Sequence, residues 1–434
     1  MAIVSPNSST PTSVSNPSTS YTVPLAVVTS LFFMWGFLTC LNDILVPHLK
    51  SIFDLDYTEI MLIQFAFFGA YFVFSIPSAK IIDWMGYQRS MVAGLLTMGL
   101  GAFLFVPAAL APSYPLFLVA LIVLAAGITC LQVAANPYVT VLGRPETASS
   151  RLNLTQAFNS LGTFLAPFFG GLFILSAAPK TIEQIRTLAP EALHAYRVHE
   201  AATVKVPYVG LGIALVLLAV AIGSFKLPKI PQAQHKVGEK VNDSIWKHPN
   251  LVFGAIGIFV YVGAEVAIGS FLVNYFVQPD IGGLTEKAAA SFVAFYWGGA
   301  MVGRFIGSGL LQKMKTGLLL GICSVCAAAL VTISMLSFGH FAMYSIILVG
   351  FFNSIMFPSI FTLGVAELGP LTGDGSGILI MAIVGGALIP LAQGAIADRI
   401  GIHHAFFLPV ICYLYILFFA LSGSKPNSER HAGA

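Results

Sequence analysis

The sequence predicts an all-α membrane protein whose twelve transmembrane helices form two pseudo-symmetric six-helix bundles. Hydrophobic residues make up 57% of the 434 positions and charged residues only 9%, and the mean hydropathy is +0.86. Soluble domains carry roughly 25% charged residues, so this composition argues against a soluble fold. The apolar residues also fall into about twelve segments, six on either side of one long polar interruption.

Residues 1–20 are rich in Ser, Thr, Pro and Asn, without a basic start or an apolar core, so we expect a disordered N-terminal tail rather than a signal peptide. The segments that follow are long enough to span, since roughly 20 apolar residues cross the hydrocarbon core. Backbone groups inside lipid must pair within their own segment, and the alternation of a β-barrel is missing, so helices are predicted. They lie at residues 21–49, 58–84, 90–111, 114–142, 150–177, 206–225, 250–277, 287–312, 317–337, 341–368, 374–397 and 402–423.

The longest polar interruption runs from Lys226 to Lys247 and separates the two sets of segments. We therefore expect an N-terminal bundle at 21–226, a cytoplasmic linker at 227–247, a C-terminal bundle at 248–423 and a C-terminal tail at 424–434. A second polar stretch, from Pro179 to Lys205, is expected to form a short interfacial helix.

An even number of spans places both termini on one side of the membrane. With the termini inside, the inner loops and tails hold more Lys and Arg than the outer loops, and such residues favour the cytoplasmic side. The expected location is the cell membrane, in a bacterium the inner membrane, with both termini in the cytoplasm.

Two carboxylates lie inside predicted spans, Asp43 in the first and Glu265 in the seventh. An aspartate at such a position costs up to roughly 3 kcal/mol on insertion scales, so it usually faces a watery cavity, binds a proton or ion, or pairs with another charge. Either carboxyl group is a candidate carrier of a coupling proton, because a carboxyl group removed from water holds its proton more readily. The alternatives are a helix-end contact between Asp43 and Lys50, and a hydrogen-bonded structural acid at Glu265.

Amide side chains gather on shared helix faces. Gln132 and Asn136 are four residues apart, and Gln156 and Asn159 three apart, so each pair lies on one face of its helix. Amides within spans either join helices or face a cavity. A further amide, Gln64, shares a face with Phe67 and Tyr71, and together these side chains favour a polar cavity lined by aromatic rings.

Such a lining suits a neutral, hydroxyl-rich solute. Amides donate to and accept from hydroxyl groups, carboxylates accept from them, and aromatic faces cover the C–H patches of a pyranose. An anion would require a basic residue in the cavity, for which Arg304 is the clear candidate. The alternative for Arg304 is a clamp at the end of a bundle.

The two halves of the chain share a spacing of amide, proline and glycine residues. Gln132 lies five residues before Pro137, and Asn353 lies five residues before Pro358, with a glycine six positions after each proline. Transporters are often built from such repeats, with the substrate site between them. Asn353 is therefore a candidate ligand from the C-terminal bundle.

Other chemistry is not indicated. The sequence has no P-loop, no H-E-x-x-H and no G-x-S-x-G motif, so we expect neither an enzyme nor a cofactor. Cys323 and Cys326 form a lone C-x-x-C pair without a second cluster, which does not predict a metal site. The basic residues are scattered along loops, so nucleic acid is not an expected partner.

Four stretches make the chain recognisable: WGFLTCLND at 35–43, IQFAFFGAYF at 63–72, ANPYV at 135–139 and RLNLTQAFN at 151–159. They resemble the fucose:proton symporter family of the major facilitator superfamily, and the likeness runs over nearly all the spans. It implies the major facilitator fold, with alternating access around a central sugar site. A monomer in the lipid bilayer is the expected functional unit.

The resemblance implies that Asp43 takes part in sugar recognition and proton coupling, and that Gln132, Gln156 and Asn159 line the sugar site. The chain departs from the fucose symporter, which has a glutamate at the position of Gln132 and paired asparagines at those of Thr39 and Cys40. Fucose itself, and two coupling carboxylates in the N-terminal half, are therefore not expected.

The runs LQVAANP at 131–137 and VGAE at 262–265 look more like the glucose/galactose branch of that family. The prediction is a secondary active transporter that imports a hexose, of the glucose/galactose type or N-acetylated, by proton symport. Asp43, Gln64, Gln132, Asn136, Gln156, Asn159, Glu265 and Asn353 are the candidate sugar ligands, and Asp43 and Glu265 the candidate proton carriers. The alternatives are a sodium-coupled symporter, an efflux antiporter on the same fold, and a sugar sensor.

Overall fold

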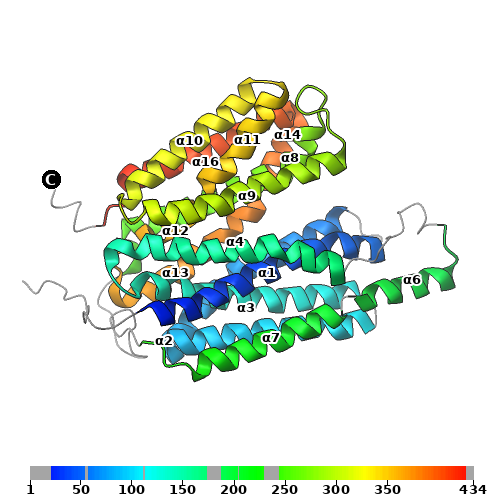
Figure 1. The fold of residues 1–434 in the computed structure, drawn as a ribbon, viewed down its shortest axis with the longest axis horizontal. Coiled ribbons are helices and arrows are strands. Elements are labelled where there is room, and N and C mark those ends of the chain that lie inside the picture. Colours follow the sequence, from blue (N-terminus) through cyan, green and yellow to red (C-terminus); the bar gives the residue numbers. More distant parts are fainter. Residues whose placement is uncertain are drawn as a thin grey trace, which may run out of the picture.

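The computed structural model describes residues 21–53, 57–110, 113–173, 187–203, 205–228 and 244–426. For 41–53, 57–61, 64, 167–173, 194, 197 and 200–203 it describes the backbone alone. Every regular element of these residues is helical, as the sequence predicts (Figure 1).

The first half of the chain forms what we call the N-terminal bundle. Its elements are α1 (Thr22–Phe53), α2 (Tyr57–Leu110), α3 (Tyr114–Val141), η1 (Pro145–Thr147), α4 (Ala148–Phe173), α6 (Pro190–Thr203) and α7 (Lys205–Ser224). Helix α2 packs along α3 and α7, and α1 packs along α4. Helix α6 falls in the polar stretch for which a short helix was expected.

The second half forms the C-terminal bundle. It begins with η3 (Ile245–Lys247), α8 (Pro249–Val277), α9 (Glu286–Leu310), α10 (Thr316–Leu336), α11 (Gly339–Asn353), α12 (Met356–Gly364) and η4 (Gly369–Leu371). It ends with α13 (Thr372–Met381), η5 (Ala382–Val384), α14 (Gly385–Ile400), α15 (Ile402–Ala405), α16 (Phe407–Phe418) and η6 (Phe419–Gly423). Helix α8 contacts α12, α14 and α16.

Ten segments of the described residues are long and apolar enough to cross a membrane. One of them lies in α2, whose 54 residues exceed twice the roughly 20 that a span needs. Gly86 interrupts it with φ 80° and ψ 167°, a conformation that glycine adopts without strain. Helix α2 therefore supplies two spans. With α4, whose 26 residues are also long enough, the described helices give the twelve predicted spans.

Two spans are broken where the sequence predicts continuous segments. Helix α11 ends at Asn353, and α12 begins at Met356. Pro358 explains this break, because a proline cannot donate to the carbonyl four residues earlier and its ring clashes with it. In the next span, the 3-10 turn η5 separates α13 from α14.

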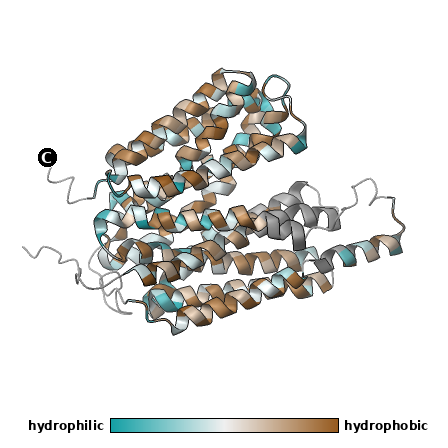
Figure 2. Ribbon diagram, viewed as in Figure 1, coloured by the Kyte–Doolittle hydropathy of each residue, from teal (hydrophilic) through white to brown (hydrophobic). Residues whose placement is uncertain are grey.

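Both ends of the described chain lie at one end of the molecule, on the left of Figure 1. We call this end the terminal face. Because successive spans alternate in direction, α3 ends and α4 begins at this face, and α9 and α12 end there while α10 and α13 begin there. Figure 2 shows hydrophobic residues along the lengths of the helices. Many of these side chains are exposed, as Leu217 of α7 is at 64%, which is the arrangement required for contact with lipid.

Candidate functional site

Gln132 and Tyr71 meet between α3 and α2 of the N-terminal bundle. The Gln132 Nε2 atom donates to the Tyr71 hydroxyl at 2.7 Å, and the two residues are 2% and 3% exposed. The Tyr71 ring packs against Phe67 and Phe68, with ring centroids 5.5 and 6.5 Å apart. The Gln132 amide and the aromatic rings of α2, which the sequence predicts as cavity-lining groups, are therefore in contact with one another.

Several buried amide atoms on α3 and α4 have no hydrogen-bond partner in the part of the chain that the structure describes. Gln132 Oε1, both polar atoms of the Asn136 side chain, and Gln156 Nε2 are buried without a hydrogen-bond partner among the described residues. A buried polar atom left unpaired costs about 1–3 kcal/mol, and native proteins retain few of them. These atoms therefore form a set of donors and acceptors available to a neutral polar ligand.

Asn159 is engaged differently. Its Nδ2 atom donates to the main-chain carbonyl of Phe32 at 2.9 Å, which ties α4 to α1. The helices touch closely here, since a Cβ atom on Gly36 would lie 2.7 Å from Asn159 Nδ2. In this conformation Asn159 positions α1, the helix that carries Asp43, and its direct contact with a ligand stays a prediction.

The side chains of Asp43 and Gln64 lie outside the described residues. The backbone at Asp43 is helical and belongs to α1, and that at Gln64 belongs to α2. One turn before Asp43, the Thr39 hydroxyl donates to the Trp35 carbonyl at 2.9 Å. The predicted roles of Asp43 and Gln64 stay predictions.

In the C-terminal bundle, tyrosines occupy every polar group of Asn353 that was expected to face a ligand. Asn353 Nδ2 donates to the Tyr296 hydroxyl at 2.9 Å, and Asn353 Oδ1 accepts from the Tyr413 hydroxyl at 2.8 Å. The Tyr261 hydroxyl donates to the Asn353 main-chain oxygen at 3.1 Å. Asn353 therefore joins α8, α9 and α16 to the end of α11, and in this conformation its amide is used within the bundle.

Glu265 belongs to the same network through its main chain. The Tyr296 hydroxyl donates to the Glu265 carbonyl oxygen at 3.3 Å. The Oε1 atom of the Glu265 side chain is buried with no hydrogen-bond partner among the described residues. Tyr261 and Arg304 are the polar neighbours that interact with this carboxyl group. The structure therefore buries one acid with an unused oxygen in the C-terminal bundle.

Arg304 joins the two bundles, as the clamp alternative requires. One guanidinium nitrogen, Nη1, donates to the Ser160 hydroxyl on α4. The Arg304 Nε atom donates to the Ser354 carbonyl at 3.3 Å. Because Pro358 has no N–H group, it leaves the carbonyl of Ser354, four residues earlier, without its helical donor. The proline thus supplies the acceptor that Arg304 uses.

The related proline of the N-terminal bundle has the same consequence. Pro137 leaves the carbonyl of Val133 without its helical donor, and this oxygen accepts from the Ser376 hydroxyl on α13 at 2.8 Å. The hydrogen bond crosses between the bundles beside Gln132. At each of these prolines a side chain from another helix donates to the freed carbonyl, Arg304 from within the C-terminal bundle and Ser376 from the opposite bundle.

Further hydrogen bonds between the bundles lie toward the terminal face. The Ser149 and Thr362 hydroxyls are 2.6 Å apart, and the Ser150 hydroxyl donates to the Ser308 carbonyl at 2.7 Å. Asn153 Nδ2 donates to the Arg304 carbonyl, also at 2.7 Å. These contacts connect the first turns of α4 with the last turns of α9 and α12.

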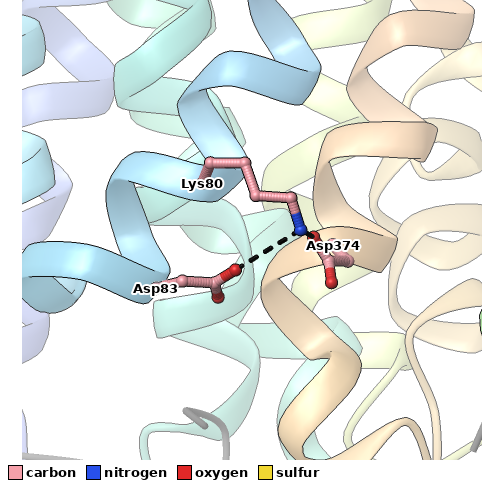
Figure 3. A network of polar contacts seen from close by, with 3 residues as sticks. All are labelled: Lys80, Asp83 and Asp374. Atoms are coloured by element: carbon pink, nitrogen blue, oxygen red, sulfur yellow. Dashed lines mark hydrogen bonds and ion pairs between the residues drawn. The ribbon is translucent and has the colours of Figure 1, made fainter. Parts of the chain in front are cut away.

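An ion pair also joins the two bundles at the terminal face. Lys80 Nζ lies 2.8 Å from Asp374 Oδ1 and 3.6 Å from Asp83 Oδ2. Figure 3 shows the ammonium group held between the Asp83 carboxylate of its own helix α2 and the Asp374 carboxylate at the start of α13. The lysine is 62% exposed, and the two aspartates are 12% and 22% exposed.

Sequence reasoning missed several of these residues. Tyr296 and Tyr413 gave no signal beyond being tyrosines in apolar spans, and Ser160 none at all. Lys80 and Asp374 carried a signal, because both were predicted at the inner ends of spans in opposite bundles. Among the described residues, no three His, Cys, Asp or Glu side chains are grouped to hold a metal ion.

Comparison with known proteins gives a consistent result. Residues 26–383 match the family model of the Major Facilitator Superfamily. A glucose/galactose transporter of Brucella abortus biovar 1 (strain 9-941) is 52% identical over 406 residues, covering 94% of this chain and 95% of the relative. An L-fucose-proton symporter of Escherichia coli (strain K12) is 36% identical over 93% of each chain. The crystal structure of a major facilitator superfamily transporter, FucP, in the outward conformation superposes with a TM-score of 0.86 and 34% identity, over 94% of this chain and all of that one.

Proposed function

Because the chain belongs to the major facilitator superfamily, we propose that it is a secondary active transporter that imports a hexose together with a proton. The fold and family expected from the sequence are confirmed, and the relatives are transporters rather than enzymes. The relatives named for glucose and galactose support a sugar of that type, and those named as proton symporters support the coupling.

The observation that carries this function is the set of buried, unpartnered amide atoms on α3 and α4, at Gln132, Asn136 and Gln156. Neutral donors and acceptors suit the hydroxyl groups of a sugar. Arg304, the cation that contacts α4 one turn after Gln156, is engaged with Ser160 and Ser354. An anionic substrate would lack a free basic partner among these side chains.

The coupling proton is carried by Asp43, with Glu265 as a second acid from the opposite bundle. Glu265 has an unused, buried carboxyl oxygen, and Asp43 matches the segment-one aspartate of the fucose symporter family. A proton neutralises such an acid when the transporter changes conformation, and the charged form returns when water reaches it. Sodium is the alternative ion.

We assign the terminal face to the cytoplasm, with the protein in the inner membrane of a bacterium. The bias of Lys and Arg toward the inner loops supports this orientation. The described hydrogen bonds and the ion pair between the bundles lie on the terminal-face side of the molecule. With that face in the cytoplasm, the conformation is outward-facing, as in the similar FucP structure.

Uptake in proteoliposomes tests the function. The purified protein should accumulate labelled glucose or galactose when an inward proton gradient is imposed, in the absence of sodium. If accumulation requires sodium, then sodium rather than the proton is the coupling ion. Movement of sugar only against the direction of proton flow would establish the efflux antiporter. Sugar binding without transport would establish a sensor.

A further inference from the structure

We propose that Tyr71 and Gln132 act as one unit that recognises a single hydroxyl group of the sugar, which makes Tyr71 a specificity-determining residue. The inference rests on the proposed function and deepens it. It begins from the 2.7 Å hydrogen bond between Gln132 Nε2 and the Tyr71 hydroxyl, which is buried between α2 and α3.

The pair keeps at least one donor and one acceptor in reserve. As the Gln132 amide stands, its nitrogen donates to Tyr71, so the Tyr71 O–H remains to donate and Gln132 Oε1 remains to accept. If the amide is turned over, Tyr71 donates to the oxygen, and the amide nitrogen and the phenolic lone pair are left instead. Either way the unit offers both functions side by side. A sugar hydroxyl both donates and accepts, so one such group completes the unit.

A purely structural role explains the pair poorly. As a structural joint, the pair would serve only to hold the first span of α2 against α3. A single hydrogen bond that leaves Gln132 Oε1 unpaired adds little to this contact, and two apolar side chains of the same shape would serve it as well. A ligand hydroxyl that reaches the unpaired oxygen gives it a partner.

The surroundings of Tyr71 fit a pyranose and lie toward the opposite bundle. Phe67 meets the Tyr71 ring at 66° with centroids 5.5 Å apart, and aromatic surfaces of this kind cover the C–H patches of a sugar ring. Phe68 extends to the C-terminal bundle, where a Cβ atom on Gly386 would lie 2.7 Å from the Phe68 ring. The unit therefore sits at the boundary that a central ligand occupies.

The unit is also neutral. Neither an amide nor a phenol exchanges a proton readily near neutral pH. Sugar recognition by this unit is therefore separate from proton coupling. Variants of the unit should change which sugars are accepted while the dependence on the proton gradient persists.

The test is sugar counterflow in proteoliposomes, with unlabelled galactose, glucose and their monodeoxy analogues as competitors. Wild-type protein should discriminate strongly against one deoxy position. Tyr71→Phe should weaken the apparent affinity for the parent sugar roughly tenfold and leave the affinity for that deoxy analogue nearly unchanged. The variant should therefore lose discrimination at this position alone. Gln132→Met should give the same pattern, and the double variant should add little. Tyr275→Phe is the control, because its buried hydroxyl contacts Ser334 and His403 at the end of the C-terminal bundle opposite the terminal face.

The outcomes separate the two proposals. If Tyr71→Phe transports hexose but discriminates among the deoxy analogues as wild type does, the inference is wrong and the proposed function stands. A loss of maximal rate that is equal for every analogue also overturns it, because a structural joint behaves in that way. If wild-type protein moves no hexose, the proposed function fails, and this inference fails with it.

Discussion

Lys80 Nζ lies 2.8 Å from Asp374 Oδ1, so an ion pair ties α2 of the N-terminal bundle to α13 of the C-terminal bundle at the terminal face (Figure 3). Asp83, one turn after Lys80, keeps the ammonium group in place at 3.6 Å. The same side of the molecule holds the contacts of Ser149 and Ser150 with the opposite bundle. Opening a path through this face must break all of them, so each contributes to the balance between the two conformations.

Removing the lysine should shift that balance toward the conformation open at the terminal face. Lys80 is largely exposed, and exposed ion pairs contribute roughly 0.2–1 kcal/mol, so Lys80→Gln should change the population ratio by up to about fivefold. Spin-label distances between the bundles at the terminal face measure the shift. Lys313→Gln, at an exposed lysine on the same face, is the control. Equal distance distributions in the two variants would contradict a gating role for the pair.

The predictability of the fold and that of the site differ for a physical reason. Hydropathy gave the twelve spans, because lipid constrains every residue along a helix in the same way. It did not predict the break before Pro358, since it treats 341–368 as one continuous span. It could not show that Asn353 is held by Tyr296 and Tyr413, since these tyrosines are 57 and 60 positions away. The Lys80–Asp374 pair joins residues 294 positions apart, and such pairings arise only when the helices are packed.

Within the candidate site, sequence reasoning proposed residues but could not predict their hydrogen-bonding states. Gln132, Asn136 and Gln156 keep unpartnered polar atoms, as ligand-binding residues would. Asn159 uses its amide to hold α1, and the same reasoning had no means of distinguishing it from Gln156. An amide in a membrane span either joins helices or faces a cavity, and the neighbouring backbone decides which.

Asp43→Asn should abolish uphill accumulation of sugar while leaving exchange of sugar across the membrane. An amide of the same size still hydrogen-bonds to hydroxyl groups, but it cannot bind and release a proton. The measurement is uptake driven by an imposed pH gradient, compared with counterflow at equal pH. Accumulation at the wild-type level would remove Asp43 from the coupling mechanism.

Glu265→Gln should weaken the pH dependence of transport without removing sugar binding. The buried Oε1 atom has no hydrogen-bond partner among the described residues, so an amide fits the same space and keeps the contacts of the main chain with Tyr296. Initial rates of uptake across a range of pH measure the effect. A variant whose pH profile overlays that of wild type would leave the coupling to Asp43 alone.

The prolines of the two repeats should act on the conformational balance through the carbonyls that they free. In Pro358→Ala the new N–H group competes with Arg304 for the Ser354 oxygen, and in Pro137→Ala it competes with Ser376 for the Val133 oxygen. A net hydrogen bond contributes about 1 kcal/mol, so Pro137→Ala, which weakens a contact between the bundles, should shift the balance roughly fivefold toward opening at the terminal face. The Arg304–Ser354 hydrogen bond lies within the C-terminal bundle, so Pro358→Ala should act only through the position of Arg304, whose Nη1 atom contacts Ser160 of α4, and should shift the balance less. The readout is the same spin-label distance as for Lys80→Gln.

Pro390→Ala provides the matched control for these variants. It also restores an N–H group inside a helix, α14, but no described hydrogen bond crosses between the bundles at the carbonyl of Gly386, four residues earlier. If Pro390→Ala shifts the distances as much as the other two, helix straightening rather than competition for the carbonyl is the cause. If the double variant Pro358→Ala with Arg304→Lys shifts no further than Arg304→Lys alone, the effect of Pro358 passes through the arginine, as the geometry requires.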